Sequence, residues 1–505
     1  MNVGALLANA AGKFPRRTAL VAGSRRLSFA ELERRCGQLA GALLAAGLEP
    51  GDRVALLSYN TDYLVESYFA LVRAGLVATP VNFRLVGPEM AYILNHSGAR
   101  ALIHGPEFQD TLMEVADELE ALELRVCPGG AEGARDYEEF LASGSYLPVA
   151  QVVGEDHPCQ LMYTSGTTGR PKGAVITHRN VLWNLVNTIH GRQDAPGQRS
   201  IIVGPLYHTA ALNNHLTIQI ALGGTSILLE KFDPELMLRT IEKERATTIS
   251  GSPAMYNLLL QYPGASRFDT SSIVKCTAGA DKLPLETKRR LMEFFPGIEG
   301  VYDVYGCTEA SPCITILAAA DSLRKDGSVG LPLPFLDARV VDGEGNPLAP
   351  GQVGEIVCRG PNVMLGYHQD PEATARVLRR GWLHTGDLAR VDEEGFFYVV
   401  DRIKDMIVSG GENIYPREIE EVLFSHPAIA DAAVVGMPDP TWGESVRAFV
   451  VLRDGQHLDQ EEVVAYCKKH LAGYKKPKRV DFVAAIPRNA SGKALKRELR
   501  ARPLD

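Results

Sequence analysis

The sequence predicts an α/β protein: a large N-terminal domain of doubly wound α/β layers plus a small β subdomain, followed by a small mobile α+β C-terminal domain. Three observations lead to this prediction. Short β-rich runs alternate with helical patterns to about residue 300, Gly and Pro become frequent after residue 328, and a compact α+β pattern follows residue 401. Strands that alternate with helices are typical of parallel sheets covered by helices.

The first 300 residues carry the alternating pattern. Residues 29–47 have helical apolar spacing that stops at Gly47, and glycine commonly ends helices. A buried strand at 53–59, a helix at 63–75 and a strand at 77–82 follow. Similar runs predict strands at 200–204, 225–229, 247–251 and 274–279 and a helix at 234–245.

The remaining chain differs in its composition and in its pattern of apolar residues. Short apolar runs separated by Gly and Pro predict a small β subdomain over residues 328–400. Beyond it, helical spacing at 419–426 and 461–471 and strand-like runs at 429–437, 445–452 and 479–483 predict a separate α+β domain. We therefore expect an N-terminal domain over 1–400, with the ATP and acid site, and a mobile C-terminal domain over 401–505.

The composition limits the class of protein. Hydrophobic residues make up 45% of the chain and charged residues 23%, which is the balance of a globular protein. No apolar run reaches the roughly 20 residues that span a bilayer, and the N-terminal basic residues follow the apolar stretch, unlike in a secretory signal. We expect a cytoplasmic protein with no transmembrane segment. The net charge of −8 argues against binding to nucleic acid.

The eight cysteines show no metal-binding pattern. None forms a CxxC pair, and no His/Cys cluster has the spacing of a zinc site. We expect reduced thiols and no structural metal.

The most informative segment is YTSGTTGRPKG, residues 163–173, which follows an apolar run. Glycines let a backbone approach phosphate closely, and hydroxyl and N–H groups donate to its oxygens. The segment is not a Walker A loop, because Pro171 precedes Lys172 and Gly173 follows it. A flexible surface loop is the alternative. The candidate phosphate-binding residues are Thr164, Ser165, Gly166, Thr167, Thr168, Gly169 and Lys172.

This string resembles the signature loop of the adenylate-forming (AMP-binding) superfamily, which includes acyl-CoA synthetases, beetle luciferases and the adenylation domains of peptide synthetases. The resemblance covers nearly the whole chain, and the later motifs stand in the family's order. It implies an acyl-CoA ligase similar to long-chain fatty acid–CoA ligases. Such an enzyme forms acyl-AMP and pyrophosphate from a carboxylic acid and ATP, then transfers the acyl group to coenzyme A and releases AMP.

The resemblance also implies ATP, Mg²⁺ and coenzyme A as cofactors and assigns nucleotide contacts. In YGCTE, it places Tyr305 on the adenine, Thr308 at the phosphates and Glu309 on Mg²⁺, which prefers carboxylate, phosphate and water ligands. A structural turn is the alternative for this short pattern. The segment TAGADKLP is similar to the strand and loop beside the adenine, with contacts expected at Gly279, Ala280 and Asp281. Most relatives have Pro at the position of Asp281, so its role stays open.

Two further nucleotide contacts are implied. The resemblance assigns Asp387 to the two ribose hydroxyls, which a carboxylate can accept, and Arg402 to a position beside the nucleotide. A turn residue after Gly386 is the alternative for Asp387.

The C-terminal motifs imply domain movement. Asp401 stands at the family's hinge, and Gly410 and Gly411 stand where a pantetheine channel forms, unless they simply make a hairpin turn. Lys493 matches the lysine that bridges the carboxylate and the α-phosphate, where developing negative charge needs a cation. A surface lysine is the alternative. The implied catalytic residues are Lys493, His208, Thr308 and Glu309.

The acid pocket is implied by PLYHTAALNNH, residues 205–215, in which His208 lies nearest the acyl carbon. No Asp stands where amino-acid-activating relatives bind the amine. The pocket candidates are mostly small or apolar, which suits a fatty or an aromatic acid. Asn213 and Asp281 could instead bind a polar substituent of the acid. The pocket candidates are His208, Thr209, Asn213, Ser252, Met255, Gly306, Cys307 and Pro312.

We therefore expect a medium- or long-chain fatty acid as substrate, with an aryl acid such as a cinnamate or benzoate as the alternative. Coenzyme A contacts are expected at Tyr474, Lys475 and Lys476, and the chain could form a homodimer. Two alternative functions remain open: transfer of the acyl group to a carrier protein, and a luciferase-like oxygenase reaction. A nucleotide-binding regulator on an inactive scaffold should have lost Lys493, Glu309 or Asp387, yet all three are present.

Overall fold

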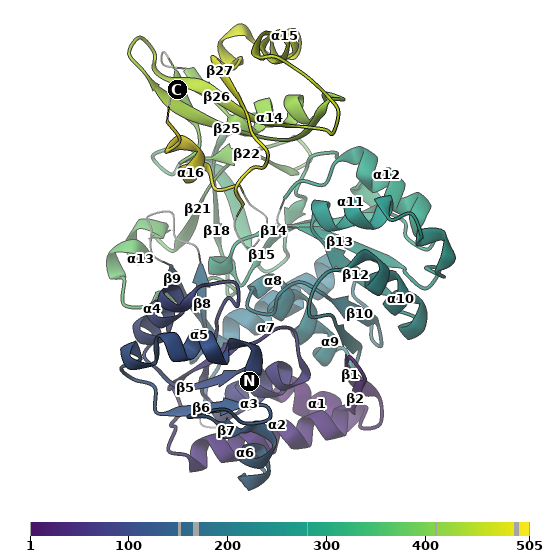
Figure 1. The fold of residues 1–505 in the computed structure, drawn as a ribbon, viewed down its shortest axis with the longest axis vertical. Helices are drawn as coiled ribbons and strands as arrows, with labels where there is room; N and C mark the ends of the chain where they lie inside the picture. Colours follow the sequence, from purple (N-terminus) through teal and green to yellow (C-terminus); the bar gives the residue numbers. More distant parts are fainter. Residues whose placement is uncertain are drawn as a thin grey trace. The chain divides into compact units, whose positions relative to one another are not determined.

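The computed structural model describes residues 2–149, 153–164, 171–279, 281–409, 412–488 and 494–503. The chain forms two compact units, one of Met1–Ala338 with Cys358–His384 and one of Arg339–Val357 with Thr385–Asp505. Figure 1 follows the elements from the N-terminus to the C-terminus. The expectation that residues 401–505 act as a mobile domain stays a prediction.

A nine-stranded sheet carries most of the candidate site in the first unit. Its order is β16-β15-β14-β13-β12-β10-β11-β1-β2, and the strands from β14 to β1 are parallel. Its strands are β1 (Thr18–Ala22), β2 (Arg25–Ser28), β10 (Arg199–Ile202), β11 (Thr225–Leu228), β12 (Thr248–Gly251), β13 (Lys275–Gly279), β14 (Val301–Gly306), β15 (Cys313–Leu317) and β16 (Leu331–Pro332). This confirms the strands predicted near residues 200, 225, 247 and 274.

A second sheet of eight strands has the order β19-β9-β8-β4-β3-β5-β6-β7 and is parallel from β8 to β7. Strand β9 is antiparallel to both of its neighbours. The strands are β3 (Arg53–Leu57), β4 (Val77–Pro80), β5 (Ala99–His104), β6 (Leu124–Cys127), β7 (Arg135–Asp136), β8 (Pro158–Thr164), β9 (Lys172–Thr177) and β19 (Gly366–Tyr367).

Helices connect the parallel strands, as the doubly wound pattern predicted. Helix α2 begins at a capping box between Ser28 and Glu31, and α3 ends at Gly75 with a φ of 81°, a conformation that glycine adopts without strain. The helices of this unit are α1 (Gly4–Lys13), α2 (Phe29–Ala45), α3 (Asp62–Ala74), α4 (Gly87–Ser97), α5 (Gln109–Glu114), α6 (Tyr137–Ser143), α7 (His178–Arg192), α8 (Thr209–Ala211), the π-helix η3 (Leu212–Leu216), α9 (Thr217–Ala221), α10 (Pro234–Glu244), α11 (Pro253–Gln261), α12 (Leu285–Phe294) and α13 (Pro371–Val377).

The two faces of the nine-stranded sheet differ in polarity. On one face, the aligned side chains of Ile201, Ile249 and Cys276 join a core cluster with residues of α10, α11 and α12. Figure 1 shows these helices beside the strands. Side chains alternate between the faces along a strand. The opposite face therefore carries two polar rows, one of Ser200, Thr248 and Lys275 and one of Ser250, Thr277 and Tyr302.

A third sheet corresponds to the predicted β subdomain. Its order is β17-β18-β21-β20, with β22 paired to β21. The strands are β17 (Asp337–Val341), β18 (Gly354–Arg359), β20 (Leu378–Arg379), β21 (Trp382–Val391) and β22 (Phe397–Arg402).

The α+β pattern predicted after residue 401 is confirmed. A fourth sheet has the order β24-β23-β26-β25, with β27 paired to β26, and one core cluster joins it to α14 and α15 (Figure 1). The elements are β23 (Ile407–Ser409), β24 (Glu412–Ile414), α14 (Pro416–Phe424), β25 (Ile429–Asp439), β26 (Gly443–Leu452), α15 (Gln460–His470), β27 (Arg479–Phe482) and α16 (Lys496–Arg500).

Two general features concern the apolar character of the helices and the state of the cysteines. Across the described ranges, no helix combines the length and the apolar character that a membrane span requires. The eight cysteines all lie within these ranges, and each is a free thiol.

Candidate active site

Four neighbouring parallel strands bring the predicted motifs to one edge of the nine-stranded sheet. Strands β10, β12, β13 and β14 are adjacent and parallel, and the carboxyl edge of such a sheet is where α/β proteins bind ligands. The segments at or after these ends hold Tyr207 and His208, Ser252, Gly279 and Asp281, and Tyr305 and Gly306. Ala280 lies outside the described residues.

The predicted phosphate loop connects an antiparallel hairpin. Strands β8 and β9 pair down to Thr164 and Lys172, which are direct partners across the hairpin. The hairpin therefore fixes both ends of the loop. Five of the predicted phosphate-binding residues lie outside the described residues, namely Ser165, Gly166, Thr167, Thr168 and Gly169.

Tyr367 connects the loop lysine to the predicted metal ligand. Its hydroxyl donates a 2.6 Å hydrogen bond to Glu309 Oε1, and Lys172 Nζ lies 5.3 Å from the centre of its ring, within the range of a cation–π contact. Burial, and then the charge of Glu309, raise the pKa of Tyr367, so its hydroxyl stays protonated and donates. No pattern in the sequence indicated this residue, because the contact depends on the pairing of β19 with β9.

Helix α4 holds both flanks of the phosphate loop. The Tyr92 hydroxyl donates to the Pro171 carbonyl at 3.2 Å, and His96 Nδ1 lies 2.8 Å from the Tyr163 hydroxyl. Tyr92 and His96 are one helical turn apart, so they present on one side of α4. Sequence reasoning missed both, although their i, i+4 spacing was visible.

The segment YGCTE forms a tight turn after β14. A Cβ atom on Gly306 would lie 1.7 Å from the Pro312 carbonyl oxygen, so a side chain cannot fit there without a backbone shift. The Cys307 N–H donates to the same carbonyl at 2.9 Å. Thr308 and Glu309 follow in a short 3₁₀ turn, and the Glu309 carbonyl accepts from the Met364 N–H at 2.8 Å. Glu309 is thus fixed by main-chain and side-chain contacts.

Three of the predicted acid-pocket residues, His208, Thr209 and Asn213, lie in the helical segment after β10. His208 precedes α8, its ring centre lies 4.4 Å from that of Tyr207, and Thr209 is buried. Asn213 lies in the π-helix, and such segments often occur at functional sites. Its amide pairs with that of Gln160 at 2.8 and 3.1 Å.

Ser252 and Met255 form the N-terminus of α11. The Ser252 hydroxyl accepts from the Met255 N–H at 3.4 Å, which is an N-cap.

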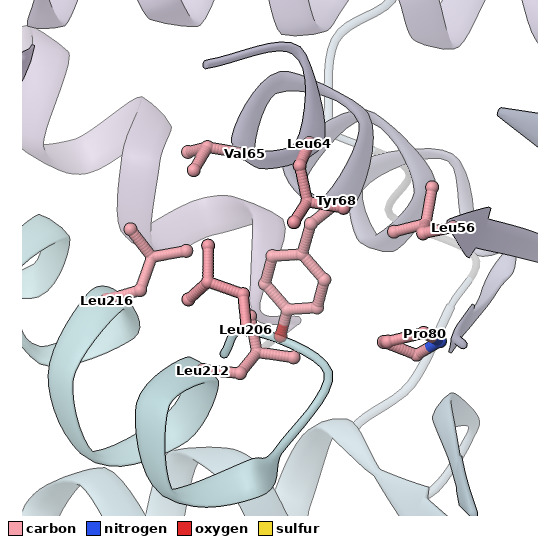
Figure 2. Close-up of a pocket in the computed structure, with 8 residues that line it drawn as sticks. All are labelled: Leu56, Leu64, Val65, Tyr68, Pro80, Leu206, Leu212 and Leu216. Carbon is pink, nitrogen blue, oxygen red and sulfur yellow. The ribbon is translucent and has the colours of Figure 1, made fainter. Parts of the chain in front are cut away.

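A small apolar cavity lies behind the His208 segment, and Figure 2 shows the residues around it. It is lined by side chains of α3, including Tyr68, and by Leu206, Leu212 and Leu216 from the segment after β10. Its volume is about 10 Å³, about the space of one water-sized group. We interpret it as a packing defect of the core, because its lining offers almost no polar atoms.

In the second unit, the predicted ribose ligand lies opposite the predicted nucleotide arginine. Asp387 and Arg402 are direct partners on β21 and β22, and Arg402 Nε lies 3.2 Å from Asp387 Oδ1. The Asp387 N–H donates to the Thr385 hydroxyl at 3.1 Å, and the side chain is 11% exposed. The structure brings together two residues that the resemblance assigned to one nucleotide.

The predicted hinge residue accepts a hydrogen bond from the first turn of a helix. Asp401 Oδ1 accepts from the Arg402 N–H at 2.7 Å, and Oδ2 accepts from the Arg417 N–H at 2.9 Å, in the first turn of α14. A carboxylate at a helix N-terminus is favourable. Burial nevertheless raises the pKa of Asp401, against the nearby charge of Lys496.

The predicted coenzyme A contacts have different environments. Lys475 donates to both carboxylate oxygens of Glu418 at 2.7 Å, whereas Tyr474 is 49% exposed and Lys476 is half-buried. Gly410, Gly411 and Lys493 lie outside the described residues.

Glu309 has the chemistry that a magnesium ligand needs. Among the residues that the structure describes, no group of three or more His, Cys, Asp or Glu side chains could hold an ion by itself. One fixed carboxylate fits Mg²⁺, which is usually held by one or two carboxylates together with substrate phosphates and water.

Comparison with known proteins decides the family. The AMP-binding enzyme family matches residues 7–368, and the AMP-binding enzyme C-terminal domain matches residues 418–493. The chain belongs to the AMP-binding enzyme family. A feruloyl-CoA synthase of Amycolatopsis sp is 45% identical, over 97% of this chain and 96% of the relative. An indoleacetate–CoA ligase of Aromatoleum aromaticum is 38% identical, over 97% and 96%.

Other AMP-binding enzymes are similar along the whole chain. A long-chain-fatty-acid–CoA ligase of Bacillus subtilis is 36% identical, over 98% of this chain and 93% of the relative. ATP-bound MatB from Rhodopseudomonas palustris is 33% identical, with a TM-score of 0.90 over 99% and 98% of the two chains. An anthranilate CoA ligase, AuaEII, in complex with anthranoyl-AMP is 27% identical, with a TM-score of 0.91 over 99% and 97%.

These comparisons confirm the predicted fold class and enzyme class. This AMP-binding enzyme is an acid–thiol ligase, an AMP-forming acyl-CoA synthetase that uses ATP and coenzyme A.

Proposed function

We propose that the enzyme ligates an aryl carboxylic acid to coenzyme A. The observation that carries this proposal is the 45% identity to a feruloyl-CoA synthase over nearly the full length of both chains. The similarity to an indoleacetate–CoA ligase supports it, because that relative is also named for an aromatic acid. The sequence alone favoured a medium- or long-chain fatty acid, and the aryl alternative is now at least equally supported.

The first half-reaction joins the acid to AMP. A carboxylate oxygen attacks the α-phosphorus of ATP, and the bond to pyrophosphate breaks. We propose that Thr164, Lys172 and Thr308 contact the phosphates, together with the loop residues between Thr164 and Lys172. Negative charge develops on the phosphoryl oxygens, and fixed cations such as Lys172 and Lys493 lower the barrier by stabilising it.

Further residues position the nucleotide and the metal. Glu309 is proposed to bind Mg²⁺, which would neutralise phosphate charge. Tyr305 and the residues after β13, including Gly279, are proposed to contact the adenine. Asp387 and Arg402 are proposed to contact the ribose, and their 3.2 Å separation supports a shared role.

The second half-reaction forms the thioester. The thiol sulfur attacks the acyl carbon, its proton leaves, and the bond between the acyl carbon and AMP breaks. His208 is proposed to lie beside this carbon. Gly410, Gly411 and Tyr474 remain the proposed coenzyme A contacts, and Lys475 would have to leave Glu418 to take part.

A fatty acid is the second candidate substrate. It is supported by the 36% identity to a long-chain-fatty-acid–CoA ligase over 98% of this chain.

The test is an acid panel. Purified enzyme is incubated with ATP, Mg²⁺ and matched sets of arylpropenoic, benzoic and C6 to C16 fatty acids, and pyrophosphate release and the acyl-CoA mass are measured. We expect the highest kcat/KM among the aryl acids. A fatty acid that exceeds every aryl acid would favour the second candidate, and failure of all acids to yield AMP would contradict the ligase assignment.

A further inference from the structure

A buried polar cavity lies in the first unit. Its lining includes Arg192, His215, Gln219, Thr248, Lys275 and Thr277. It lies between the polar face of β10, β12 and β13 and the helices α7 and α9, which supply Arg192 and Gln219. The volume is about 10 Å³, enough for about one water-sized group.

Fixed ionic groups surround this cavity. Arg192 donates to Asp194 Oδ2 from Nε at 2.9 Å and from Nη2 at 2.6 Å. Lys275 Nζ donates to Asp194 Oδ1 at 2.8 Å and to the Arg192 carbonyl at 2.6 Å. Burial lowers the pKa of His215 to about 3, so its ring is neutral near pH 7. These contacts hold the side chains rigidly and leave the group with one excess positive charge.

Three buried polar atoms of the residues that line this cavity have no hydrogen-bond partner within the described chain: Arg192 Nη1, Gln219 Oε1 and Thr248 Oγ1. Arg192 and Gln219 are each 2% exposed, and Thr248 is 7% exposed. Buried polar atoms in native proteins nearly always have a hydrogen-bond partner, since an unpaired one is costly. The polar face is also unusual, because sheets covered on both faces normally carry apolar side chains on each.

In their hydrogen-bonding character, the three atoms are complementary to a hydroxyl group. A hydroxyl can accept from Arg192 Nη1 and donate to Gln219 Oε1, with Thr248 Oγ1 able to do either. A carboxylate fits less well, because it needs more space and cannot donate to Gln219 Oε1.

The cavity and the candidate acid site lie at opposite ends of the same two elements, strand β13 and the helical segment after β10. Along β13, the distance from Gly279 to Lys275 is about 13 Å at the rise of a strand. Along the helical segment after β10, the distance from His208 to His215 is about 10 Å at the rise of a helix. An aromatic ring on a short linker can bridge such a length. Thr277, which also lines the cavity, is aligned with Ser250 on the polar face of the sheet, and these two side chains suit an aliphatic chain poorly.

We propose that this cavity is the far end of the acid-binding site and receives a hydroxyl group on the ring of the substrate. The enzyme then selects ring-hydroxylated aryl acids over acids with a hydrogen or a methyl group in that place. This inference rests on the proposed function, since it names the substrate class of the same site.

The test compares 4-hydroxycinnamate with cinnamate and 4-methylcinnamate, the last being similar in shape to the hydroxylated acid. The kcat/KM for pyrophosphate release is measured in the natural enzyme and in Thr248→Val and Gln219→Leu. We expect the natural enzyme to prefer the hydroxylated acid by about 10–100-fold, the effect of a hydrogen bond to a charged or buried group. In the variants this ratio should fall to about threefold or less.

Thr79→Val is the matched control. Thr79 Oγ1 is also buried and unpaired within the described chain, but it lies on β4 in the other sheet. This variant should keep the full preference for the hydroxylated acid. Thermal unfolding of all variants checks the fold, and the ratio between acids is insensitive to the fraction of folded enzyme.

The outcomes separate the inference from the proposed function. Equal turnover of hydroxylated and unsubstituted acids by the natural enzyme would overturn the inference alone. So would a preference that survives in both cavity variants, which would mean that the cavity holds a structural water only. Turnover of fatty acids with none of the aryl acids would overturn the proposed function and the inference with it.

Discussion

The hydroxyl of Tyr367 donates a 2.6 Å hydrogen bond to Glu309, the predicted magnesium ligand. Tyr367→Phe removes this bond and leaves the Glu309 carboxylate freer to turn away. A hydrogen bond to a charged group contributes about 1.5–3 kcal/mol, so we expect adenylation to slow by about 10–100-fold at limiting Mg²⁺. The measurement is pyrophosphate release as a function of Mg²⁺ concentration.

Tyr398→Phe is a suitable control, because it removes a similar bond to Asp392 in the second unit. An unchanged magnesium dependence in Tyr367→Phe would show that the bond does not position the ligand.

Tyr92 should affect ATP binding more than the chemical step. Its hydroxyl holds the Pro171 carbonyl at the end of the phosphate loop. Tyr92→Phe loses a neutral hydrogen bond, which contributes about 0.5–1.5 kcal/mol. We expect KM for ATP to rise by about 2–10-fold with kcat nearly constant, measured by initial rates across ATP concentrations. A fall in kcat at an unchanged KM for ATP would argue against a role in positioning the loop.

Lys493→Ala should separate the two half-reactions. If this lysine stabilises charge on the α-phosphate, its loss should slow acyl-adenylate formation by about 10²–10³-fold. Thioester formation from supplied acyl-adenylate should be largely retained. Lys468→Ala, at an exposed position of α15, should leave both steps intact. Equal loss in both half-reactions of Lys493→Ala would contradict the assigned role.

Gly411→Leu should give the opposite pattern. A leucine side chain at the proposed pantetheine channel would obstruct coenzyme A, so we expect thioester formation to be lost. Pyrophosphate exchange, which needs only the acid and ATP, should continue near its natural rate. Normal turnover with coenzyme A would disprove the channel.

His178 should make the first unit sensitive to acid. Its Nδ1 accepts from the Val3 N–H at 3.0 Å, so the ring must be neutral there. Burial, and then the charge of His157, lower the pKa of His178 to about 4. Because the folded-state pKa is below the unfolded value of about 6.5, stability is complete above pH 6.5 and is lost as the pH falls toward 4. The loss should approach roughly 3 kcal/mol.

Urea denaturation at several pH values measures this effect. His178→Asn keeps an acceptor near the position of Nδ1 but cannot titrate. Its stability should therefore depend less on pH between 6.5 and 4 than that of the natural protein. The same slope in both proteins would assign the acid sensitivity to other groups.

Local patterns in the sequence predicted most of the fold. The strands near residues 200, 248 and 275 were recognisable because each is a short apolar or β-branched run between turn residues. The resemblance supplied the order of the motifs, and the parallel strands explain why they meet at one edge. It also paired Asp387 with Arg402, which the hairpin of β21 and β22 brings together.

Contacts between distant segments were beyond sequence reasoning. The bond between Tyr367 and Glu309 depends on a strand pairing that no local pattern indicates. Lys475 was predicted as a coenzyme A contact, and its ion pair with Glu418 joins residues far apart in the sequence. A lysine in solvent and a lysine in such a pair look the same in a sequence.

The alternation of side chains along β12 gives adjacent residues unrelated tasks. Thr248 points to the polar face, whereas Ile249 points into the apolar core beneath α10 and α11. In a library of single substitutions along this strand, the effect of a substitution should alternate with a period of two residues. Substitutions at every second position would alter thermal stability, and substitutions at the positions between them would alter which acids are accepted. The substrate specificity can therefore change without loss of fold stability.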